Sequence, residues 1–200
     1  VQAAPGVGIP VVYLQDAFML KGEPHRPDAD HALVESEYAR ELFVENGFPP
    51  EATQVIGPIR FDPLRVGNGA RTTAPYCAEL TGASQERKFV VFATDPGSLV
   101  NTTAQKYHSE LTAMQDVAGL TDVHLIVKLH PADVGDITRR ALRESGAENI
   151  TIVESCDLHR VMSECSIWIS MYSTTVIESL IHGVYVLLTN YEGLDLFKDA

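Results

Sequence analysis

Short apolar runs alternate with amphipathic stretches through the second half of the chain. The β-rich runs are Lys88–Ala93, Val123–Leu129, Ile150–Val153, Ile167–Ile169 and Val184–Leu188. Between them, apolar positions recur at helical spacing over 103–117, 136–145, 158–164 and 173–181. Apolar strands that alternate with helices of about 10–15 residues are typical of a parallel sheet covered on both faces. The pattern predicts an α/β fold with a Rossmann-like, doubly wound parallel sheet.

The first part of the chain has a different pattern. We expect strands at Ile9–Leu14 and Ala32–Val34, and a helix at Glu35–Asn46 closed by Gly47. A polar, glycine-bearing stretch from Val66 to Thr73 then interrupts the apolar pattern, as inter-domain linkers do. The sequence therefore predicts two lobes, with residues 1–66 holding the end of one lobe and a connection, and residues 67–200 forming the other.

Composition and charge exclude several classes of function. The chain has 200 residues, of which 45% are hydrophobic and 21% charged, as in an ordinary globular protein. Its formal charge is −12, which argues against the basic face that binding to nucleic acid or to an anionic membrane surface requires. No apolar stretch reaches the length of about 18 residues that a membrane span needs, and no signal peptide is recognisable.

Cysteine usage indicates a reducing compartment. Cys77, Cys156 and Cys165 have no regular spacing, so they indicate neither a disulfide framework nor a metal site. We expect reduced thiols and a cytoplasmic protein. The chain begins at Val1 without an initiator methionine, shortly before an apolar run, and we expect it to be a piece of a longer protein.

The strongest candidate chemistry lies between an apolar strand and a helix. The hydroxyls of Ser173, Thr174 and Thr175 could cap this helix, whose free N–H groups and positive dipole end attract phosphate. Glu178 follows within the first turn or so, on a face where its carboxylate could accept hydrogen bonds from ribose hydroxyls. Ser and Thr are also ordinary helix caps, and Glu is common near a helix start, so a purely structural interpretation stays open.

A second candidate is the end of the strand at Val123–Leu129. Pro131 stops this strand by removing a backbone donor, and His130 could then donate to a phosphate oxygen or hold a sugar hydroxyl. Alternation along the strand places Lys128 on the side of His130, where it could add positive charge. A His-Pro pair at a strand end is more often a simple turn.

The remaining candidates are weaker. Thr94–Ser98 offers a polar loop after a strand, although its spacing matches neither GxGxxG nor GxxxxGK[ST], and an ordinary βα turn is the simpler interpretation. Asp157 is expected as a helix N-cap and His182 as a helix-end histidine. Minor acid–base or cleft candidates are Gln15–Asp16, Asp133 and Asp136. The histidines show no HExxH or paired spacing, so we expect no metal site.

In their order along the chain, these segments resemble GT-B proteins. HALVESEYARELFVENGFPPEATQVIGPIRFDPL resembles the end of their N-terminal lobe and the inter-lobe connection. FVVFATDPGS, HLIVKLHPAD and SIWISMYSTTVIESLIHGVYVLLTN resemble their C-terminal lobe. Among GT-B proteins the sequence resembles bacterial surface-polysaccharide enzymes, namely capsule and sialic-acid transferases, CDP-glycerol-type glycerophosphate transferases and the UDP-N-acetylglucosamine 2-epimerase group.

The resemblance implies a nucleotide-sugar site in residues 67–200. In several of these enzymes an HP pair and a Ser-Ser/Thr pair hold the nucleotide and its phosphates. His130 and Pro131 match the first pair, Ser173 and Thr174 match the second, and Glu178 matches a carboxylate that grips ribose in the epimerase group. With Thr175, Lys128 and Thr94 beside them, these residues form the expected nucleotide- and phosphate-binding set.

The resemblance further implies a metal-independent glycosyltransferase that makes surface polysaccharide or glycoconjugate. Its substrates would be a nucleotide sugar and a glycan acceptor, with no separate cofactor. The lobe that usually carries the catalytic base is mostly absent, and Gln15–Asp16 stands where the glycerophosphate transferases have a histidine. We therefore expect this piece to bind a donor without turning it over alone. The alternatives are a nucleotide-sugar 2-epimerase and a non-catalytic GT-B-derived module. An early region left exposed could also self-associate into a homo-oligomer.

Overall fold

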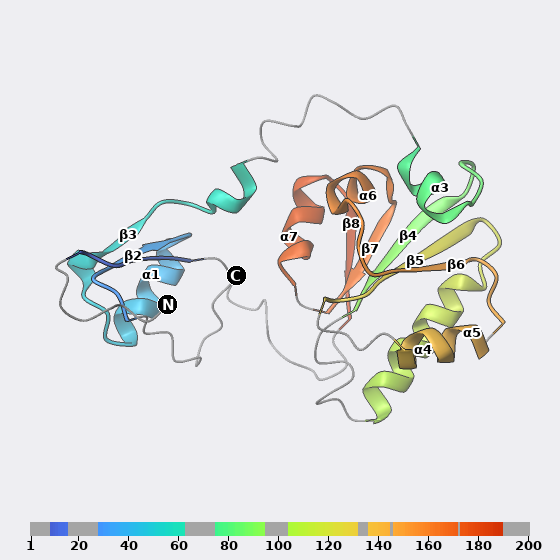
Figure 1. Cartoon of the computed structure of the whole chain (residues 1–200), viewed down its shortest axis with the longest axis horizontal. Helices are drawn as coiled ribbons and strands as arrows, with labels where there is room; N and C mark the ends of the chain where they lie inside the picture. The colour runs from blue at the N-terminus through green and yellow to red at the C-terminus, as the bar shows by residue number, and fades with distance from the viewer. Residues whose placement is uncertain are drawn as a thin grey trace. The chain divides into compact units, whose positions relative to one another are not determined.

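The computed structural model describes residues 9–15, 28–62, 75–94, 104–131, 136–144, 146–171 and 173–189. The chain divides into two compact units, Val1–Gly69 and Ala70–Ala200. Each unit contains its own parallel β-sheet with helices packed on it (Figure 1). The expected α/β class with a Rossmann-like sheet is confirmed. The functional lobe boundary expected after residue 66 stays a prediction.

The described part of the first unit contains a small three-stranded parallel sheet and the nine-residue helix α1. Its elements are β1 (Val12–Leu14), β2 (His31–Val34), α1 (Glu37–Glu45), η1 (Pro50–Ala52), β3 (Thr53–Val55) and η2 (Ile59–Phe61). The strand order is β1-β2-β3. The sequence pattern did not predict β3, because its residues form no apolar run. Pairing with β2, in the register Ala32↔Thr53, makes this segment a strand.

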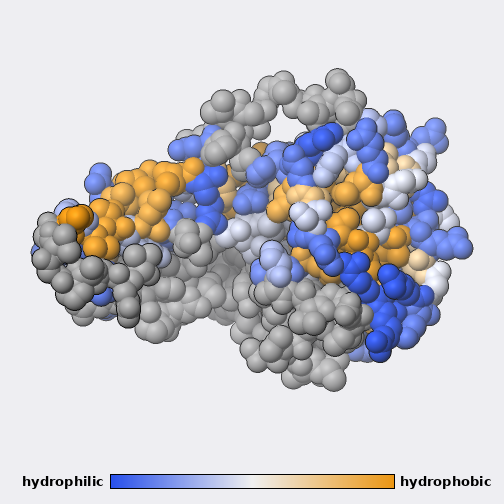
Figure 2. All heavy atoms as spheres, viewed as in Figure 1, coloured by the Kyte–Doolittle hydropathy of each residue, from blue (hydrophilic) through white to orange (hydrophobic). Residues whose placement is uncertain are grey.

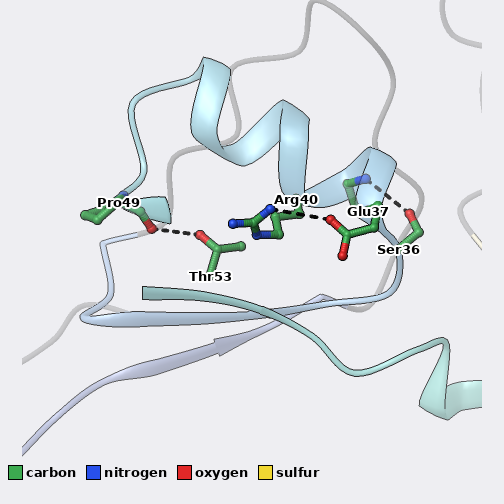
Figure 3. Close-up of polar contacts among 6 residues, drawn as sticks. Ser36, Glu37, Arg40, Pro49 and Thr53 are labelled. Carbon is green, nitrogen blue, oxygen red and sulfur yellow. Dashed lines mark hydrogen bonds and ion pairs between the residues drawn. The ribbon is translucent and has the colours of Figure 1, made fainter. Parts of the chain in front are cut away.

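Helix α1 begins two residues later than the pattern predicted. Ser36 has an extended backbone, and its hydroxyl accepts a hydrogen bond from the Ala39 amide at 3.1 Å (Figure 3). At the other end Gly47 has a φ of 87°, and the Phe48 amide donates to the Phe43 carbonyl at 2.9 Å. This is the Schellman arrangement that a glycine after a helix favours.

The core of the first unit is apolar and partly aromatic. The Phe43 ring lies 5.6 Å from that of Tyr13 and 5.9 Å from that of Phe48, between centroids. Buried residues of β2 and α1 complete the cluster: Ala32, Val34, Ala39 and Leu42. At the start of β3, the Thr53 hydroxyl donates to the Pro49 carbonyl at 2.9 Å (Figure 3). The first unit therefore has a core of its own.

The second unit is a five-stranded parallel sheet of order β6-β5-β4-β7-β8. In chain order its elements are α3 (Tyr76–Thr81), β4 (Lys88–Ala93), α4 (Ala104–Ala118), β5 (Val123–Lys128), α5 (Asp136–Glu144), β6 (Ile150–Val153), α6 (Leu158–Glu164), β7 (Ile167–Ser170), α7 (Thr174–Ile181) and β8 (Tyr185–Leu188). From β4 onward these bounds agree with the sequence pattern to within a residue or so. Strands β4 and β5 are almost continuously buried because they lie inside the sheet.

Helices cover both faces of this sheet. On one face, Met114 of α4 and Leu142 of α5 pack against Val90, Phe92 and Val127 of the central strands. On the other face, α3 and α6 pack against β4 and β7; the buried residues there include Cys77, Val161, Met162, Val91 and Trp168. The sheet is therefore doubly wound, as the alternation of strands and helices predicted.

Helix α3 was not predicted, and a distant residue holds its start. The Glu164 carboxylate, at the end of α6, accepts hydrogen bonds from the Tyr76 amide at 2.9 Å and the Cys77 amide at 2.8 Å. The Arg160 guanidinium lies over the Tyr76 ring, 4.2 Å from its centroid. The Tyr76 hydroxyl accepts a hydrogen bond from the Asp157 amide at 2.9 Å. These contacts join α3 to α6.

Both sheets have apolar side chains on an edge strand. Val12 and Leu14 of β1 are exposed, and so are Tyr185, Leu187 and Leu188 of β8, where Tyr185 is 81% accessible. Figure 2 shows hydrophobic residues at the surface of each unit, beside hydrophilic ones. Exposed apolar patches commonly mark contact surfaces. Within the described part of the chain, no helix combines the length and the hydropathy needed to cross a membrane.

Candidate functional site

The ends of four strands meet at the carboxyl edge of the second unit's sheet. Ala93 of β4 pairs with Lys128 of β5. On the other side of β4, Ser170 of β7 pairs with Leu188 of β8. Because all the strands are parallel, the segments that leave them emerge at this one edge. The structure therefore brings the backbones that carry Thr94, Lys128–Pro131 and Ser173–Thr175 to the same edge of one sheet.

The side of β4 on which the chain adds successive strands changes within this sheet. From β4 the chain passes through α4 and α5 to β5 and β6, on one side of the sheet order. It then crosses through α6 to β7, which lies on the other side of β4, and continues through α7 to β8. Open α/β sheets bind ligands beyond the carboxyl ends of the strands at such a switch point. Here the switch point is between β4 and β7.

Helix α7 begins directly after β7 and is capped by Ser173. The backbone of Ser173 is extended, with φ −164° and ψ 153°, and its hydroxyl accepts a hydrogen bond from the Thr175 amide at 3.3 Å. Ser173 therefore caps the helix, as expected. Its hydroxyl oxygen already accepts this one hydrogen bond, so only part of its hydrogen-bonding capacity is left for a ligand. The first N–H groups of a helix have no partners within the helix, and its dipole is positive at this end.

The side chains of the first α7 turns divide between two faces. Ser179 is fully buried, and its hydroxyl donates to the Thr175 carbonyl one turn earlier, at 2.7 Å. The Thr175 hydroxyl oxygen is also buried and has no hydrogen-bond partner among the described residues. Thr174 and Glu178 share another helix face by their spacing of four, and both are half-buried. Glu178 is the fifth residue of α7 and therefore lies in its second turn.

The end of β5 carries the second candidate group. Val127 and Leu129 pack on the α4–α5 face, so Lys128 between them projects to the opposite face. The Lys128 ammonium donates to the Leu129 carbonyl at 2.5 Å. The His130 amide donates to the Thr94 hydroxyl at 2.9 Å. Pro131 lies beyond the end of the strand, as the sequence predicted, and is exposed. This cross-strand bond between Thr94 and His130 had no signal in the sequence.

Other candidates are structural or lie outside the described residues. Asp157 caps α6, since its carboxylate accepts from the Arg160 amide at 3.2 Å. The His182 ring, at the end of α7, stacks on that of His159 at 5.6 Å between centroids, and burial followed by the charge of His159 lowers the pKa of His182. Both predicted helix-end roles are confirmed. The residues outside are Asp16, Asp95–Ser98, Asp133 and the side chain of Asp136.

Gln15, the other half of the minor cleft candidate in the first unit, holds its own sheet together. It is buried at the end of β1, and its side-chain oxygen accepts a hydrogen bond from the Glu35 amide at 2.9 Å. The Glu35 carboxylate in turn lies 3.3 Å from the Arg60 guanidinium. These contacts give Gln15 and Glu35 a structural task within the first unit.

Burial favours the uncharged forms of the three thiols and of the histidine in β5. All three cysteines are free. Burial raises the pKa of Cys77 and of Cys165 to about 12, so both thiols stay protonated. Burial, followed by the charge of Arg87, lowers the pKa of His124, whose ring bonds the Thr151 hydroxyl at 2.9 Å. Among the described residues, no three potential metal-ligating side chains gather.

A shallow hollow lies at the opposite, amino edge of the sheet. It has a volume of about 530 Å³, and its lining comes from the end of α4, around Gly119, and from the segment 146–149 before β6. The described carboxyl-edge candidates contribute nothing to this lining. The hollow is therefore a second, separate surface feature against which binding at the carboxyl edge can be compared.

Comparisons with known proteins show the fold. Neither a protein-family model nor a curated protein sequence matches the chain. S. aureus MnaA, solved with UDP, superposes with a TM-score of 0.58 at 13% identity, over 82% of this chain and 43% of that one. UDP-GlcNAc 2-epimerase from Neisseria meningitidis, bound to UDP-GlcNAc, gives 0.56 at 13% identity, over 80% and 44%.

A third similar structure is the wall teichoic acid polymerase TagF. It gives a TM-score of 0.51 at 18% identity, over 82% of this chain and 38% of that one. The chain thus spans less than half the length of each of these proteins. At such identities the similarity speaks for architecture alone. It shows that the chain has a Rossmann-like α/β fold similar to that of the matched parts of these proteins.

Proposed function

We propose that the second unit binds the nucleoside diphosphate of a nucleotide sugar at the carboxyl edge of its sheet. The observation that carries this proposal is the start of α7 at the switch point, with Ser173 as its cap and the His130 segment emerging from β5 at the same edge. An anion at this place would meet backbone N–H groups, hydroxyls and the positive end of a helix dipole. The similarity to structures solved with UDP and UDP-GlcNAc supports the same ligand class.

The proposal gives a role to each of the candidate side chains. The hydroxyl and N–H groups of Ser173 and Thr174, both half-buried at the start of α7, would bind the phosphates. The buried Thr175 hydroxyl, which has no hydrogen-bond partner among the described residues, could add a further contact. His130 would contact a phosphate or the sugar. Glu178, on the Thr174 face of α7, would accept hydrogen bonds from the ribose. Lys128 adds positive charge close by, although its ammonium is also held by a backbone carbonyl.

The reaction class proposed for the longer protein is glycosyl transfer without a metal ion. As the nucleoside diphosphate departs, negative charge grows on its phosphate oxygens. Helix-terminal N–H groups and hydroxyls, fixed before the reaction, would stabilise that charge in the manner of a bound cation. The acceptor would be a growing surface polysaccharide or glycoconjugate. The free thiols of the chain fit a cytoplasmic setting.

A nucleotide-sugar 2-epimerase is the nearest alternative. One of the similar structures is a UDP-GlcNAc 2-epimerase, and another was solved with UDP. It would use the same binding residues and need no glycan acceptor. Analysis of the products of a longer form of the protein separates the two, because only the transferase consumes acceptor.

Thermal stabilisation by nucleotides tests the proposal. A panel of CMP, CDP, UDP, GDP and ADP is added to the wild-type chain and the melting temperature is recorded. A ligand at 100 times its Kd stabilises the folded state by about 2.7 kcal/mol, so at least one nucleotide is expected to raise the melting temperature. His130→Ala is expected to weaken binding about tenfold, which corresponds to about 1.4 kcal/mol.

The matched control for this experiment is His31→Ala. His31 is an exposed histidine at the start of β2 in the first unit, so its replacement is expected to leave the nucleotide response unchanged. A flat response of well-folded wild-type protein to the whole panel would contradict nucleotide binding. It would favour a non-catalytic GT-B-derived module.

A further inference from the structure

Thr94 joins the ends of β4 and β5 through two hydrogen bonds, donating in one and accepting in the other. Its amide donates to the Lys128 carbonyl at 2.9 Å, and its hydroxyl accepts from the His130 amide at 2.9 Å. Thr94 is 7% exposed, and its bond to the half-buried His130 is partly buried. Leu129 lies between Lys128 and His130, and its amide donates to the strand on the other side of β5, to the Val153 carbonyl of β6 at 2.9 Å.

The hydroxyl of Thr94 takes the place of a backbone carbonyl in the hydrogen-bond ladder between β4 and β5. In a regular parallel pair, the bond that follows Thr94 N–H to Lys128 C=O would join the His130 amide to the Thr94 carbonyl. Here the side-chain oxygen is the acceptor instead. This bond keeps His130 attached to the end of β4. The β-hydroxyl of threonine or serine can supply such a side-chain acceptor, whereas valine cannot.

We propose that Thr94 is a positioning residue, whose hydroxyl fixes His130 so that the imidazole is presented to the phosphates or sugar of the donor. This inference rests on the proposed function. It gives Thr94 a task that acts through His130, in place of the direct phosphate contact that the sequence suggested. A buried threonine hydroxyl that already accepts a backbone amide fits this task better than it fits a ligand contact.

The test compares Thr94→Val, which keeps the shape and removes the hydroxyl, with Thr94→Ser, which keeps the hydroxyl. The Kd of the most stabilising nucleotide from the panel is measured by calorimetry for each. Thr94→Val is expected to weaken binding about tenfold, and Thr94→Ser less than threefold. Thr94→Ala provides a second hydroxyl-free variant if the valine form folds poorly, with the same expected loss.

A double-mutant cycle separates positioning from direct contact. If Thr94 acts through His130, the double variant Thr94→Val/His130→Ala binds no more weakly than His130→Ala alone. As a comparison, Thr94→Val combined with Ser173→Ala is expected to give the sum of the two separate losses. Hydrogen exchange of the His130 amide provides a readout without ligand. Exchange is expected to be slow in wild type and Thr94→Ser, and at least about tenfold faster in the two hydroxyl-free variants.

The outcomes distinguish this inference from the proposed function. If wild type binds a nucleotide and the hydroxyl-free variants bind it equally well, the positioning role is wrong and the nucleotide site stands. If the losses from Thr94→Val and His130→Ala add in full, Thr94 contacts the ligand itself and the positioning role is again wrong. If folded wild type binds no nucleotide, the proposed function fails and the positioning role fails with it, whatever the exchange of the His130 amide.

Discussion

Replacing Glu164 by alanine is expected to lower the free energy of unfolding of the second unit by about 3 kcal/mol. The Glu164 carboxylate accepts hydrogen bonds from two amides at the start of α3, and hydrogen bonds to charged groups contribute about 1.5–3 kcal/mol each. Pro75, at the N-cap position of α3, supplies no side-chain cap. Alanine at 164 would leave the Tyr76 and Cys77 amides without acceptors in a half-buried place, and the contact between α3 and α6 would weaken.

Urea denaturation followed by tryptophan fluorescence measures this effect. Trp168 is the only tryptophan of the chain and is fully buried in the second unit, so its emission reports on that unit. Glu164→Gln keeps one carbonyl acceptor and is expected to lose about half as much stability. Glu86→Ala removes an exposed glutamate and is expected to change stability by less than about 0.5 kcal/mol. A loss at position 164 no larger than that at position 86 would show that the α3–α6 link is not stabilising.

The double replacement Ser173→Ala/Thr174→Val is expected to weaken nucleotide binding about 100-fold. Both hydroxyls lie at the start of α7, and each charge-assisted hydrogen bond to a phosphate contributes about 1.5–3 kcal/mol. The loss of the Ser173 cap is also expected to lower the stability of the second unit by about 1 kcal/mol. Calorimetric titration with the stabilising nucleotide measures the affinity, and urea denaturation measures the stability.

Ser36→Ala is the matched control for this double variant. Ser36 caps α1 in the first unit as Ser173 caps α7, so its loss carries a similar cost in helix stability. Nucleotide affinity is expected to stay unchanged in Ser36→Ala, because no phosphate site is proposed at α1. If the α7 variant keeps its affinity to within twofold, the phosphates do not bind at the start of that helix.

The sequence predicted best the elements whose identity depends on local pattern. Strands β4 and β5 are apolar along their length because they lie inside the sheet, and this burial is visible in the sequence as a continuous run. Elements defined by distant partners were missed. Strand β3 forms because it pairs with β2. At the start of α3, the Tyr76 amide is bonded to Glu164, which lies 88 residues away in the sequence. No local periodicity encodes such contacts.

The same distinction applies to the candidate site. That several strand ends meet at one edge followed from the prediction of a parallel sheet, and Ser173 was expected as a cap from its place before an apolar helix. The bond from His130 to Thr94 depends on the register between β5 and β4, which a single sequence does not reveal. The inward burial of the Thr175 hydroxyl likewise depends on how α7 rotates against the sheet.

The central claim is that a nucleoside diphosphate binds at the carboxyl edge of the second unit's sheet. Its most direct test is a titration of the isotope-labelled chain with UDP and CDP, followed by amide chemical shifts in NMR. The account predicts that the largest changes occur at His130 and at residues 173–176. Changes that concentrate instead at the amino-edge hollow, at Gly119 and residues 146–149, would contradict it, because that hollow lies at the opposite edge of the same sheet.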